Sequence, residues 1–522
     1  IRWATQGMVT EANAHPHRSG IWAVVHNGNI DHASLEALRT SLVMDVIAAD
    51  ATDTSIFVMA WSRFCEAEQA AGREITRTTF EAFLTRVEGT NAFVLMNLTQ
   101  PQQLFVAVQG AAELYVARGT DGGVYVVSSP GALQGIATTY TAIAPGAHVF
   151  TSDQFSWLGE ARVVDLGAPP PSTHGFDHIM AAELFHVPEA VRRVNNAATD
   201  RPMRELLPAS LLDPATAPDE IILIACGSSL YAAEYVAAFY EQQLRCPVRT
   251  IDATALAGGT LRVYGSRTLA IILSQSGTTS DTLKALECLL NACTPAQRKM
   301  LVTIGVHNNP MGALAHRVDV SLYTRTGEER ATASTMAFFG QCATLLQLLG
   351  ALQNKEVETQ EILTRVVPLL VEVRTQAEMI RVMASAINAA PAFLLLGLGT
   401  DLPIAREGAL KLKELAYVMT EAMAPGNLKH GPLALLHDRA DIIVIAPKLE
   451  HDTARYDRLV GAVKDVLTRE GHVALITTAG NRDFQSLAPK SPVVSIPVAT
   501  DLFSQGLLAV YVLQYLAYFL GD

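Results

Sequence analysis

Residues 221–227 read Ile-Ile-Leu-Ile-Ala-Cys-Gly, and residues 269–277 read Leu-Ala-Ile-Ile-Leu-Ser-Gln-Ser-Gly. Each is an unbroken apolar run that ends in small or hydroxyl residues, and a stretch of helical periodicity follows each one. Unbroken apolar runs alternating with helices are typical of parallel strands joined by crossover helices, because such strands are buried on both faces. We therefore predict that the chain beyond a helical connector near 179–195 is an α/β region with parallel sheets.

The α/β region contains an internal repeat. Residues 393–399, Phe-Leu-Leu-Leu-Gly-Leu-Gly, match residues 221–227 when Gly399 is aligned with Gly227, an offset of 172 positions. A second pair of stretches, 301–315 and 473–488, matches at nearly the same offset. Buried strands look alike in unrelated proteins, but two matches at one spacing favour a duplication. We expect two similar α/β domains in tandem.

The stretch before the α/β region has a different character. Short β-type runs such as 22–26 and 92–96 alternate with polar turns up to about residue 167, which predicts an α+β domain. Residues 167–175 hold three successive prolines, and such a run neither continues a helix nor fits a central strand, so it is an extended linker. The expected parts are 1–166, a linker and connector helix over 167–212, and two α/β domains over 213–365 and 385–522.

Composition excludes several classes of protein. The 522 residues are 49% apolar and carry a formal net charge of −12 without a block of basic residues, which disfavours a nucleic-acid partner. The six cysteines include no CxxC pair, which favours a reducing, cytoplasmic compartment over a disulfide framework. Polar residues interrupt the apolar stretch 502–520, so we predict a buried terminal helix rather than a membrane anchor.

Two predicted strand ends carry turns rich in hydroxyl groups. Cys226-Gly-Ser-Ser229 follows the first apolar run, and Ser274-Gln-Ser-Gly-Thr-Thr279 follows the second. Helix N-termini present unpaired N–H groups and hydroxyls add donors, so such turns can hold a phosphate without lysine or arginine. Ordinary helix capping would also explain serine and threonine here. Two turns at the carboxyl ends of strands in one sheet favour a small phosphorylated ligand.

A second set of chemically active side chains lies in the expected second α/β domain. In Glu407-Gly-Ala-Leu-Lys411-Leu-Lys-Glu414, helical spacing makes Lys411 and Glu414 neighbours on one face, and His430 follows in a turn. A carboxylate, an amine and an imidazole could move protons between adjacent carbons of a sugar. From spacing alone, a surface ion pair between Glu407 and Lys411 together with a loop histidine explains these residues better than a proton-transfer site does.

Three stretches near the N-terminus resemble known motifs. Residues 2–7 (RWATQG), 13–17 (NAHPH) and 26–28 (HNG) resemble motifs of the N-terminal-nucleophile glutamine amidotransferases. The resemblance implies a glutaminase domain over the first part of the chain.

Three later stretches resemble the paired sugar isomerase domains of the glutamine:fructose-6-phosphate aminotransferase family, the glucosamine-6-phosphate synthases. They are SQSG at 274–277, EGALKLKE at 407–414 and LKHGPL at 428–433. The last two together are highly specific, whereas SQSG alone indicates only a sugar isomerase domain. The matches to this family run in order along nearly the whole chain.

The resemblance implies a glutamine site in the first domain. Arg2 matches the residue that binds the carboxylate of glutamine, Trp3 belongs to a loop that closes over it, and Asp53 matches the residue that holds its amino group. Asn27 and Gly28 match the oxyanion hole, in which a side-chain amide and a backbone N–H stabilise the charge that develops during acyl transfer. Taken alone, Asn27-Gly28 is equally typical of a hairpin turn.

The resemblance also implies a sugar-phosphate site in the isomerase domains. Glu414 matches the residue that carries a proton between carbons 1 and 2, Lys411 its neighbour, and His430 the ring-opening histidine from the other subunit of a homodimer. The expected sugar-phosphate contacts are Ser229, Ser274, Gln275, Ser276 and Thr279. The implied reaction transfers ammonia from glutamine to fructose 6-phosphate and isomerises the product to glucosamine 6-phosphate. It requires no metal or organic cofactor.

The chain departs from the family pattern at both ends and at two internal positions. The family's nucleophilic cysteine precedes the position of Ile1, and its Schiff-base lysine follows that of Asp522, so we expect a fragment that is inactive as given. Thr278 replaces an acid in SQSGET, and Met336 replaces a lysine in STKAF. Either a pair of supporting residues was lost together or the sugar specificity changed.

Two other functions fit the same sequence. One is an amidotransferase-like or deglycase enzyme that acts on another phosphosugar. The other is a sugar-phosphate sensor whose isomerase domains bind a ligand without chemistry. A sensor has no use for Glu414 and His430, nor for Arg2 and Asp53, so their presence favours catalysis.

Overall fold

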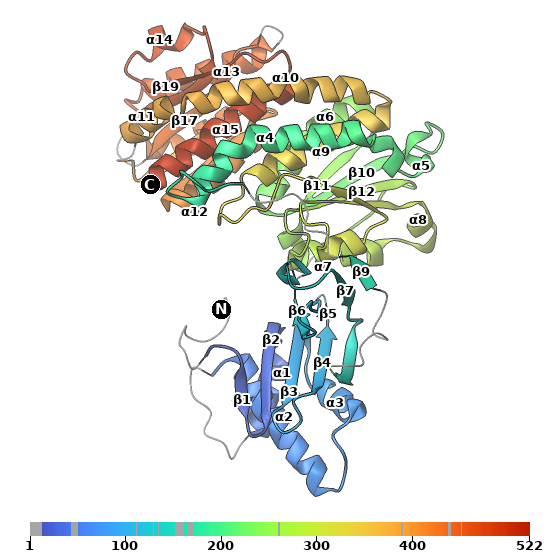
Figure 1. Cartoon of the computed structure of the whole chain (residues 1–522). Helices are drawn as coiled ribbons and strands as arrows, with labels where there is room; N and C mark the ends of the chain where they lie inside the picture. The colour runs from blue at the N-terminus through green and yellow to red at the C-terminus, as the bar shows by residue number, and fades with distance from the viewer. Residues whose placement is uncertain are drawn as a thin grey trace. The chain divides into compact units, whose positions relative to one another are not determined.

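The chain consists of two compact units, Ile1–Leu166 and Gly167–Asp522 (Figure 1). The computed structural model describes residues 13–42, 51–110, 112–128, 130–133, 135–151, 161–163, 171–258, 261–387, 390–436, 440–449 and 452–522. Each unit has its own sheets, and no sheet runs from one unit into the other within the described residues.

The first unit contains two antiparallel sheets. Their strand orders are β1-β2-β3-β4-β8 and β6-β5-β7-β9. The strands are β1 (His17–Ser19), β2 (Trp22–Ile30), β3 (Gly89–Asn97), β4 (Gln103–Gln109), β5 (Tyr115–Arg118), β6 (Val124–Val127), β7 (Thr139–Ala142), β8 (Gly146–Thr151) and β9 (Ala161–Val163).

Helices and the second sheet cover opposite faces of the first sheet. Phe57 of α2 stacks on Phe93 of β3 with ring centroids 4.0 Å apart, in a core shared by the sheet and its helices. Val106 of β4 and Val116 of β5 belong to a second core between the two sheets. The helices are α1 (His32–Ser41), α2 (Asp53–Ala70) and α3 (Arg77–Leu84). This arrangement confirms the predicted α+β domain.

The second unit begins with a parallel sheet of order β11-β10-β12-β13-β14. The two apolar runs that predicted it are β10 (Glu220–Ala225) and β12 (Thr268–Ser274), and every residue of both strands is buried. The others are β11 (Val248–Asp252), β13 (Val302–His307) and β14 (Val320–Tyr323). Burial on both faces explains why these runs lack polar alternation.

A second parallel sheet repeats this order as β16-β15-β17-β18-β19. Its strands are β15 (Ala392–Leu396), β16 (Met419–Met423), β17 (Asp441–Ala446), β18 (Val473–Thr478) and β19 (Val493–Ile496). Gly227 and Gly399, the aligned glycines, have φ of +57° and +62° in the turn between the first strand and first helix of each sheet. The predicted tandem pair of α/β domains is confirmed.

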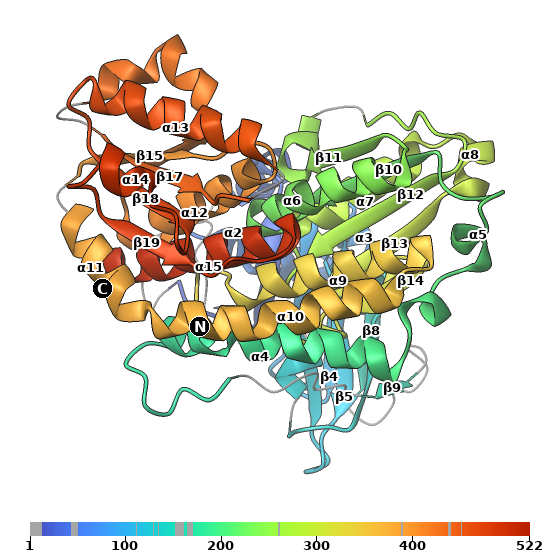
Figure 2. The same ribbon diagram turned by 90° about the horizontal axis from the view of Figure 1, so that it is seen from above.

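Helices surround both parallel sheets. Figures 1 and 2 show α4, α9 and α10 running side by side, and α4 is the predicted connector helix. The helices are α4 (Ile179–Asp200), α5 (Ala209–Leu212), α6 (Gly227–Leu244), α7 (Ser280–Ala292), α8 (Pro295–Met300), α9 (Met336–Gln353), α10 (Glu356–Thr375), α11 (Ala377–Ile387), α12 (Asp401–Ala416), α13 (Thr453–Leu467), α14 (Asp483–Leu487) and α15 (Leu502–Gly521).

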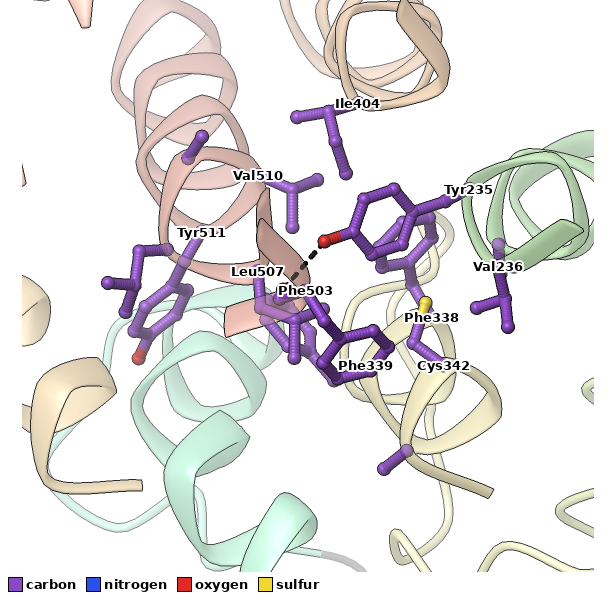
Figure 3. Packing of buried hydrophobic residues seen from close by; sticks show 14 of the residues in the cluster. Tyr235, Val236, Phe338, Phe339, Cys342, Ile404, Phe503, Leu507, Val510 and Tyr511 are labelled. Carbon is purple, nitrogen blue, oxygen red and sulfur yellow. Dashed lines mark hydrogen bonds between the residues drawn. The ribbon is translucent and has the colours of Figure 1, made fainter. Parts of the chain in front are cut away.

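One hydrophobic core joins the two α/β domains (Figure 3). Among the described residues, α9 and α15 are each long and apolar enough to cross a membrane, but 89% and 83% of their apolar windows are buried inside the protein, as in core helices. The hydroxyl of Tyr235 on α6 donates to the carbonyl oxygen of Phe503 on α15 at 2.6 Å. The terminal helix of the second domain is thereby fastened to the first.

Candidate active site

The first hydroxyl turn begins α6. Gly227 opens this helix at φ +57°, a conformation that glycine adopts without a Cβ clash. Ser229 lies in the first helical turn, and its buried Oγ accepts a hydrogen bond of 2.9 Å from Nε2 of Gln341 on α9. Within the described residues, the side chain of the N-cap residue Cys226 makes no capping bond. The first N–H groups of α6 can therefore serve a ligand.

The second hydroxyl turn connects β12 to α7. Oγ of Ser274 accepts the N–H of Gly277 at 3.0 Å and lies 2.9 Å from Oγ1 of Thr279. Oγ of Ser276 accepts the N–H of Thr278 at 3.1 Å. Thr279 directly precedes the helix, yet in this part of the structure its side chain makes no capping bond. These hydroxyls order the turn itself, so helix capping does not account for them.

Both turns lie at the carboxyl edge of the same sheet. β10 and β12 are hydrogen-bonded neighbours, with Ile224 opposite Ile272, so the turns that follow them are adjacent. The carbonyl oxygen of Gln275 accepts the N–H of Asn308 at 3.0 Å, which ties the second turn to the end of β13. Open α/β sheets bind ligands at this edge. The predicted residues found there are Ser229, Ser274, Gln275, Ser276 and Thr279.

Three charged side chains gather on α12. The side chains of Glu407 and Lys411 are 0% exposed, and that of Glu414 is 31% exposed. Nζ of Lys411 donates to Oε2 of Glu414 at 2.6 Å and lies 3.6 Å from Oε1 of Glu407. The alternative of a surface ion pair is therefore wrong, because both of its members are buried.

Burial changes the protonation of this group. It raises the pKa of Glu407 to about 7, although the ammonium of Lys411 opposes the shift. Burial lowers the pKa of Lys411, but the carboxylates of Glu407 and Glu414 outweigh it, so the net shift is upward and the amine stays protonated. A buried carboxyl that titrates near neutrality beside a fixed ammonium is typical of sites that transfer protons.

The charged group on α12 adjoins the first α/β domain. α12 packs along α6, and Ser228 of α6 faces Glu407 closely enough to lower its pKa. Glu329, in the loop before α9, acts on Lys411 and raises its pKa. The charged side chains on α12 of the second domain therefore lie next to the first hydroxyl turn of the first domain.

His430 stands apart from this group within one chain. It ends the short 3₁₀ helix η6 (Pro425–His430) and is exposed. Within the described residues no hydrogen bond or ion pair joins His430 to Lys411 or Glu414. Its role as the ring-opening residue of another subunit stays a prediction.

In the first unit, residues of three recognised segments meet at the end of β2. Asp53 opens α2, is 3% exposed, and its Oδ1 accepts the N–H of Thr54 at 2.8 Å. Oγ1 of Thr54 lies 3.0 Å from Nδ1 of His26 and 3.4 Å from Nε2 of His15. Nδ1 of His26 is also 3.9 Å from Oδ2 of Asp53. His15 of NAHPH, His26 of HNG and Thr54 thus form one polar cluster around Asp53.

Asn27 and Gly28 lie inside β2, paired with β3, so the hairpin-turn alternative is wrong. Gly28 has φ +145°, and a Cβ there would lie 2.1 Å from the carbonyl oxygen of Thr90, so only glycine fits. Asn27 is exposed, which leaves its amide accessible to a ligand. Arg2 and Trp3, the other expected glutamine contacts, lie outside the described residues.

The sequence did not indicate several residues that contact or act on the candidate site residues. They are Gln341, Asn308 and Glu329, which contact or act on Ser229, Gln275 and Lys411 respectively. Gln341 lies in α9, Asn308 directly after β13 and Glu329 in the loop before α9, all far in sequence from the residues they affect, so no motif spacing reveals them. Glu407, by contrast, lies four residues before Lys411, and helical spacing alone could have identified it as a neighbour.

The two departures inside the isomerase motifs have different surroundings. Thr278 is exposed, and its Oγ1 donates to Oγ of Ser276 at 3.0 Å. Met336 is the first residue of α9 and is 0% exposed in the hydrophobic core. The structure does not explain either replacement.

Comparison with known proteins identifies a domain family for the two α/β domains and relatives of the whole chain. The SIS domain family matches residues 216–351 and 387–520. Over 540 residues the chain is 30% identical to the isomerizing glutamine–fructose-6-phosphate aminotransferase of Corynebacterium diphtheriae, covering 99% of this chain and 83% of the relative. It is also 30% identical to the Aquifex aeolicus enzyme of the same name, with 100% and 85% covered.

Solved structures match the second unit. The C-terminal domain of glucosamine-fructose-6-phosphate aminotransferase from Francisella tularensis aligns with a TM-score of 0.57 and 26% identity, over 67% of this chain and 97% of that one. Tagatose-6-phosphate ketose/aldose isomerase from Escherichia coli aligns with a TM-score of 0.56 and 18% identity, over 67% and 94%. The second of these similarities concerns the fold alone.

Proposed function

The chain belongs to the isomerizing glutamine–fructose-6-phosphate aminotransferase family and carries two SIS domains, and we propose that it transfers glutamine-derived ammonia to fructose 6-phosphate and isomerises the product to glucosamine 6-phosphate. The observation that carries the proposal is the hydrogen-bonded pair of buried Lys411 and partly exposed Glu414 beside two hydroxyl-rich turns. The turns hold the substrate, and the pair on α12 moves its proton.

The phosphate of the sugar binds the two hydroxyl turns. The free N–H groups at the starts of α6 and α7 interact favourably with the phosphate dianion, because each helix dipole is positive at that end. Ser229, Ser276 and Thr279 add hydroxyl donors, while the bonds of Ser274 and Gln275 keep the second turn in shape. This mode of binding needs neither lysine nor arginine.

Glu414 moves the proton during isomerisation. Its carboxylate removes a proton from carbon 1 of the 2-imino sugar, whose imine nitrogen is protonated, giving a neutral 1,2-enaminol, and returns a proton to carbon 2. The hydroxyl on carbon 1 then loses its proton and becomes the aldehyde of glucosamine 6-phosphate. Lys411 holds Glu414 in place through their 2.6 Å bond, and the side chain of Glu414 is exposed enough to reach a substrate.

His430 opens the sugar ring and comes from the partner in a homodimer. Two residues in the same part of the second domain support such an interface. Tyr417 is 90% exposed and Met419 is 75% exposed, which is unusual for large apolar side chains. A second copy of the chain that covers them brings its own exposed His430 near the α12 group.

The first unit binds glutamine. Asp53, buried at the end of β2, holds the amino group of the substrate, while Arg2 and Trp3 bind and cover its carboxylate. Asn27 and the N–H of Gly28 stabilise the oxyanion, because an amide and a backbone donor aimed at developing charge lower the barrier to acyl transfer.

The chain works in the cytoplasm, since its six cysteines are free thiols.

Deuterium exchange into glucosamine 6-phosphate tests the isomerisation step on the chain by itself. It is a partial reaction, separate from the overall transfer that the sequence predicts to be inactive in this chain, because the reverse isomerisation needs no nitrogen donor. In D₂O the protein should replace the proton on carbon 2 with deuterium, seen as loss of that NMR signal. Glucosamine, which lacks the phosphate, should not exchange. Binding without exchange would indicate a sensor, and exchange confined to another phosphosugar would indicate a different enzyme.

A further inference from the structure

An irregular loop joins β14 to α9 and carries Glu329, whose charge acts on Lys411 of the proposed sugar site. Its residue Glu329 binds the start of α9, with Oε1 accepting the N–H groups of Thr335 at 2.6 Å and Ala337 at 3.1 Å. Oε2 of Glu329 accepts the hydroxyl of Ser334 at 3.0 Å. One carboxylate thus sets where α9 begins.

The position of Glu329 affects two residues of the site. Its charge acts directly on Lys411, the amine that holds Glu414. The helix that it caps carries Gln341, which donates to Ser229 in the first hydroxyl turn. A displaced Glu329 would disturb both the proton-carrying pair and one of the phosphate contacts.

Glu183 on α4 holds the loop that carries Glu329. It is 0% exposed, and its Oε1 accepts the N–H groups of Arg330 at 2.6 Å and Ala331 at 3.0 Å. Figures 1 and 2 show α4 lying beside α9, so the contact spans two neighbouring helices and the loop before one of them. A buried side chain bonded to two consecutive backbone donors fixes the path of that backbone.

We infer that Glu183 is a positioning residue for isomerisation: through the backbone of Arg330 and Ala331 it keeps Glu329 at the start of α9, the helix whose Gln341 donates to Ser229 in the first hydroxyl turn. The inference rests on the proposed function, because the site it serves is the isomerisation site. Glu183 does not touch the sugar, since its contacts are with the loop and not with the hydroxyl turns.

Hydrogen-bond geometry rather than charge is the property of Glu183 that matters. Burial raises its pKa to about 7, with Glu329 also raising it and Arg330 opposing, so at neutral pH the carboxyl is partly protonated. Only one oxygen is used, and Oε2 has no partner among the described residues. Glutamine is neutral, has the same length and presents one carbonyl oxygen. It can therefore accept the same two hydrogen bonds from Arg330 and Ala331.

Three variants separate length, hydrogen bonding and charge. Glu183→Gln keeps the acceptor and the length, so kcat for exchange at carbon 2 of glucosamine 6-phosphate should stay within about threefold of wild type. Glu183→Met keeps the size but loses the acceptor, and Glu183→Asp keeps the charge but is one methylene shorter. Both should lower kcat by about 10- to 100-fold with KM little changed, because small displacements of reacting groups are costly.

Leu184→Ala is the control for packing, since Leu184 is the adjacent, fully buried residue on α4 and has no bond to the loop. It should lower stability but leave kcat per folded molecule unchanged. An equal loss of kcat in this variant would overturn the inference, and so would wild-type kcat in Glu183→Met or Glu183→Asp. The opposite order, with Glu183→Asp active and Glu183→Gln impaired, would show that charge is what matters and would also overturn it.

Amide hydrogen exchange across residues 329–337 gives a reading that does not depend on activity. These amides should exchange faster in Glu183→Met and Glu183→Asp and at the wild-type rate in Glu183→Gln. Unchanged protection in Glu183→Met would overturn the inference even if kcat fell. Absence of exchange at carbon 2 in the wild-type protein would instead refute the proposed function, with the amide measurement still deciding whether Glu183 holds the loop.

Discussion

Nζ of Lys411 lies 2.6 Å from Oε2 of Glu414 and 3.6 Å from Oε1 of Glu407, so one ammonium stands between two carboxyl groups of the same helix. Burial disfavours the charged form of Glu407 and the neighbouring carboxylate of Glu414 disfavours it further, although the ammonium of Lys411 opposes both effects. The fully buried Glu407 is the one whose pKa rises to about 7. Glu414 is the partly exposed member and has access to a substrate.

Removing the two hydroxyls of the second turn should abolish most of the preference for phosphorylated sugar. Ser276→Ala combined with Thr279→Ala should weaken binding of fructose 6-phosphate by about 10- to 100-fold, because hydrogen bonds to a charged group are lost. Binding of fructose should not change. Titration calorimetry measures both affinities.

Thr294→Ala provides the matched control for this double variant. Thr294 is a hydroxyl residue that caps the short helix α8 and takes no part in the turn. It should leave both affinities as they are. If the wild-type protein bound fructose as tightly as fructose 6-phosphate, the phosphate assignment would be wrong.

The raised pKa of Glu407 predicts a specific dependence of stability on pH. An acid whose pKa is 4.5 in the unfolded chain and about 7 in the folded one binds its proton more tightly when folded. Its contribution to stability is therefore present below pH 4.5 and is lost as pH rises through 7. Glu407→Gln does not titrate, so its stability relative to wild type should improve by on the order of 3 kcal/mol between pH 4.5 and 8.

Urea unfolding of both proteins at several pH values measures this difference. Comparing variant with wild type cancels other titrating groups, such as His307, whose burial lowers its pKa to about 4. A constant difference in unfolding free energy across the range would show that Glu407 stays ionised throughout.

Mixing two inactive variants tests whether His430 acts across a dimer. Glu414→Gln lacks the proton carrier and His430→Ala lacks the ring-opening group, so each alone should be nearly inactive. When subunits exchange at equal ratio, half of the dimers are mixed, and each mixed dimer has one site with both groups intact. About one quarter of wild-type exchange at carbon 2 should return.

No recovery on mixing, with mixed dimers demonstrated by mass, would mean that both groups come from one chain. Tyr417→Asp with Met419→Asp complements this test, because charges on the exposed apolar surface should give monomers in sedimentation. Such monomers should bind the sugar phosphate but not exchange it. Exchange by a monomer would exclude a histidine from the partner.

The sequence was sufficient to predict the parallel sheets and their duplication. The apolar runs of β10 and β12 are buried on both faces, so their pattern depends on little beyond the strand itself. The hydroxyl turns follow directly from those strand ends and were predicted with them. Local pattern and structure agree wherever the neighbours in the chain are also the neighbours in space.

Prediction from the sequence failed where distant segments decide the surroundings. Helical spacing places Glu407 near Lys411, but elements distant in the sequence that pack on α12, among them α6 and α15, bury the pair. Asn27-Gly28 has the local signature of a hairpin turn, and pairing with β3 makes it strand instead. Glu183 binds backbone groups 147 and 148 positions away, which no local pattern encodes.

The most direct test of Glu414 as the proton carrier compares wild type with Glu414→Gln. The measurement is the rate at which deuterium replaces the proton on carbon 2 of glucosamine 6-phosphate. Glu421→Gln, the same change at an exposed position on β16, serves as the control. We expect wild-type exchange in the control and a fall of about 10²- to 10⁴-fold in Glu414→Gln, with binding of the sugar phosphate unchanged. Exchange at the wild-type rate in Glu414→Gln would contradict this role.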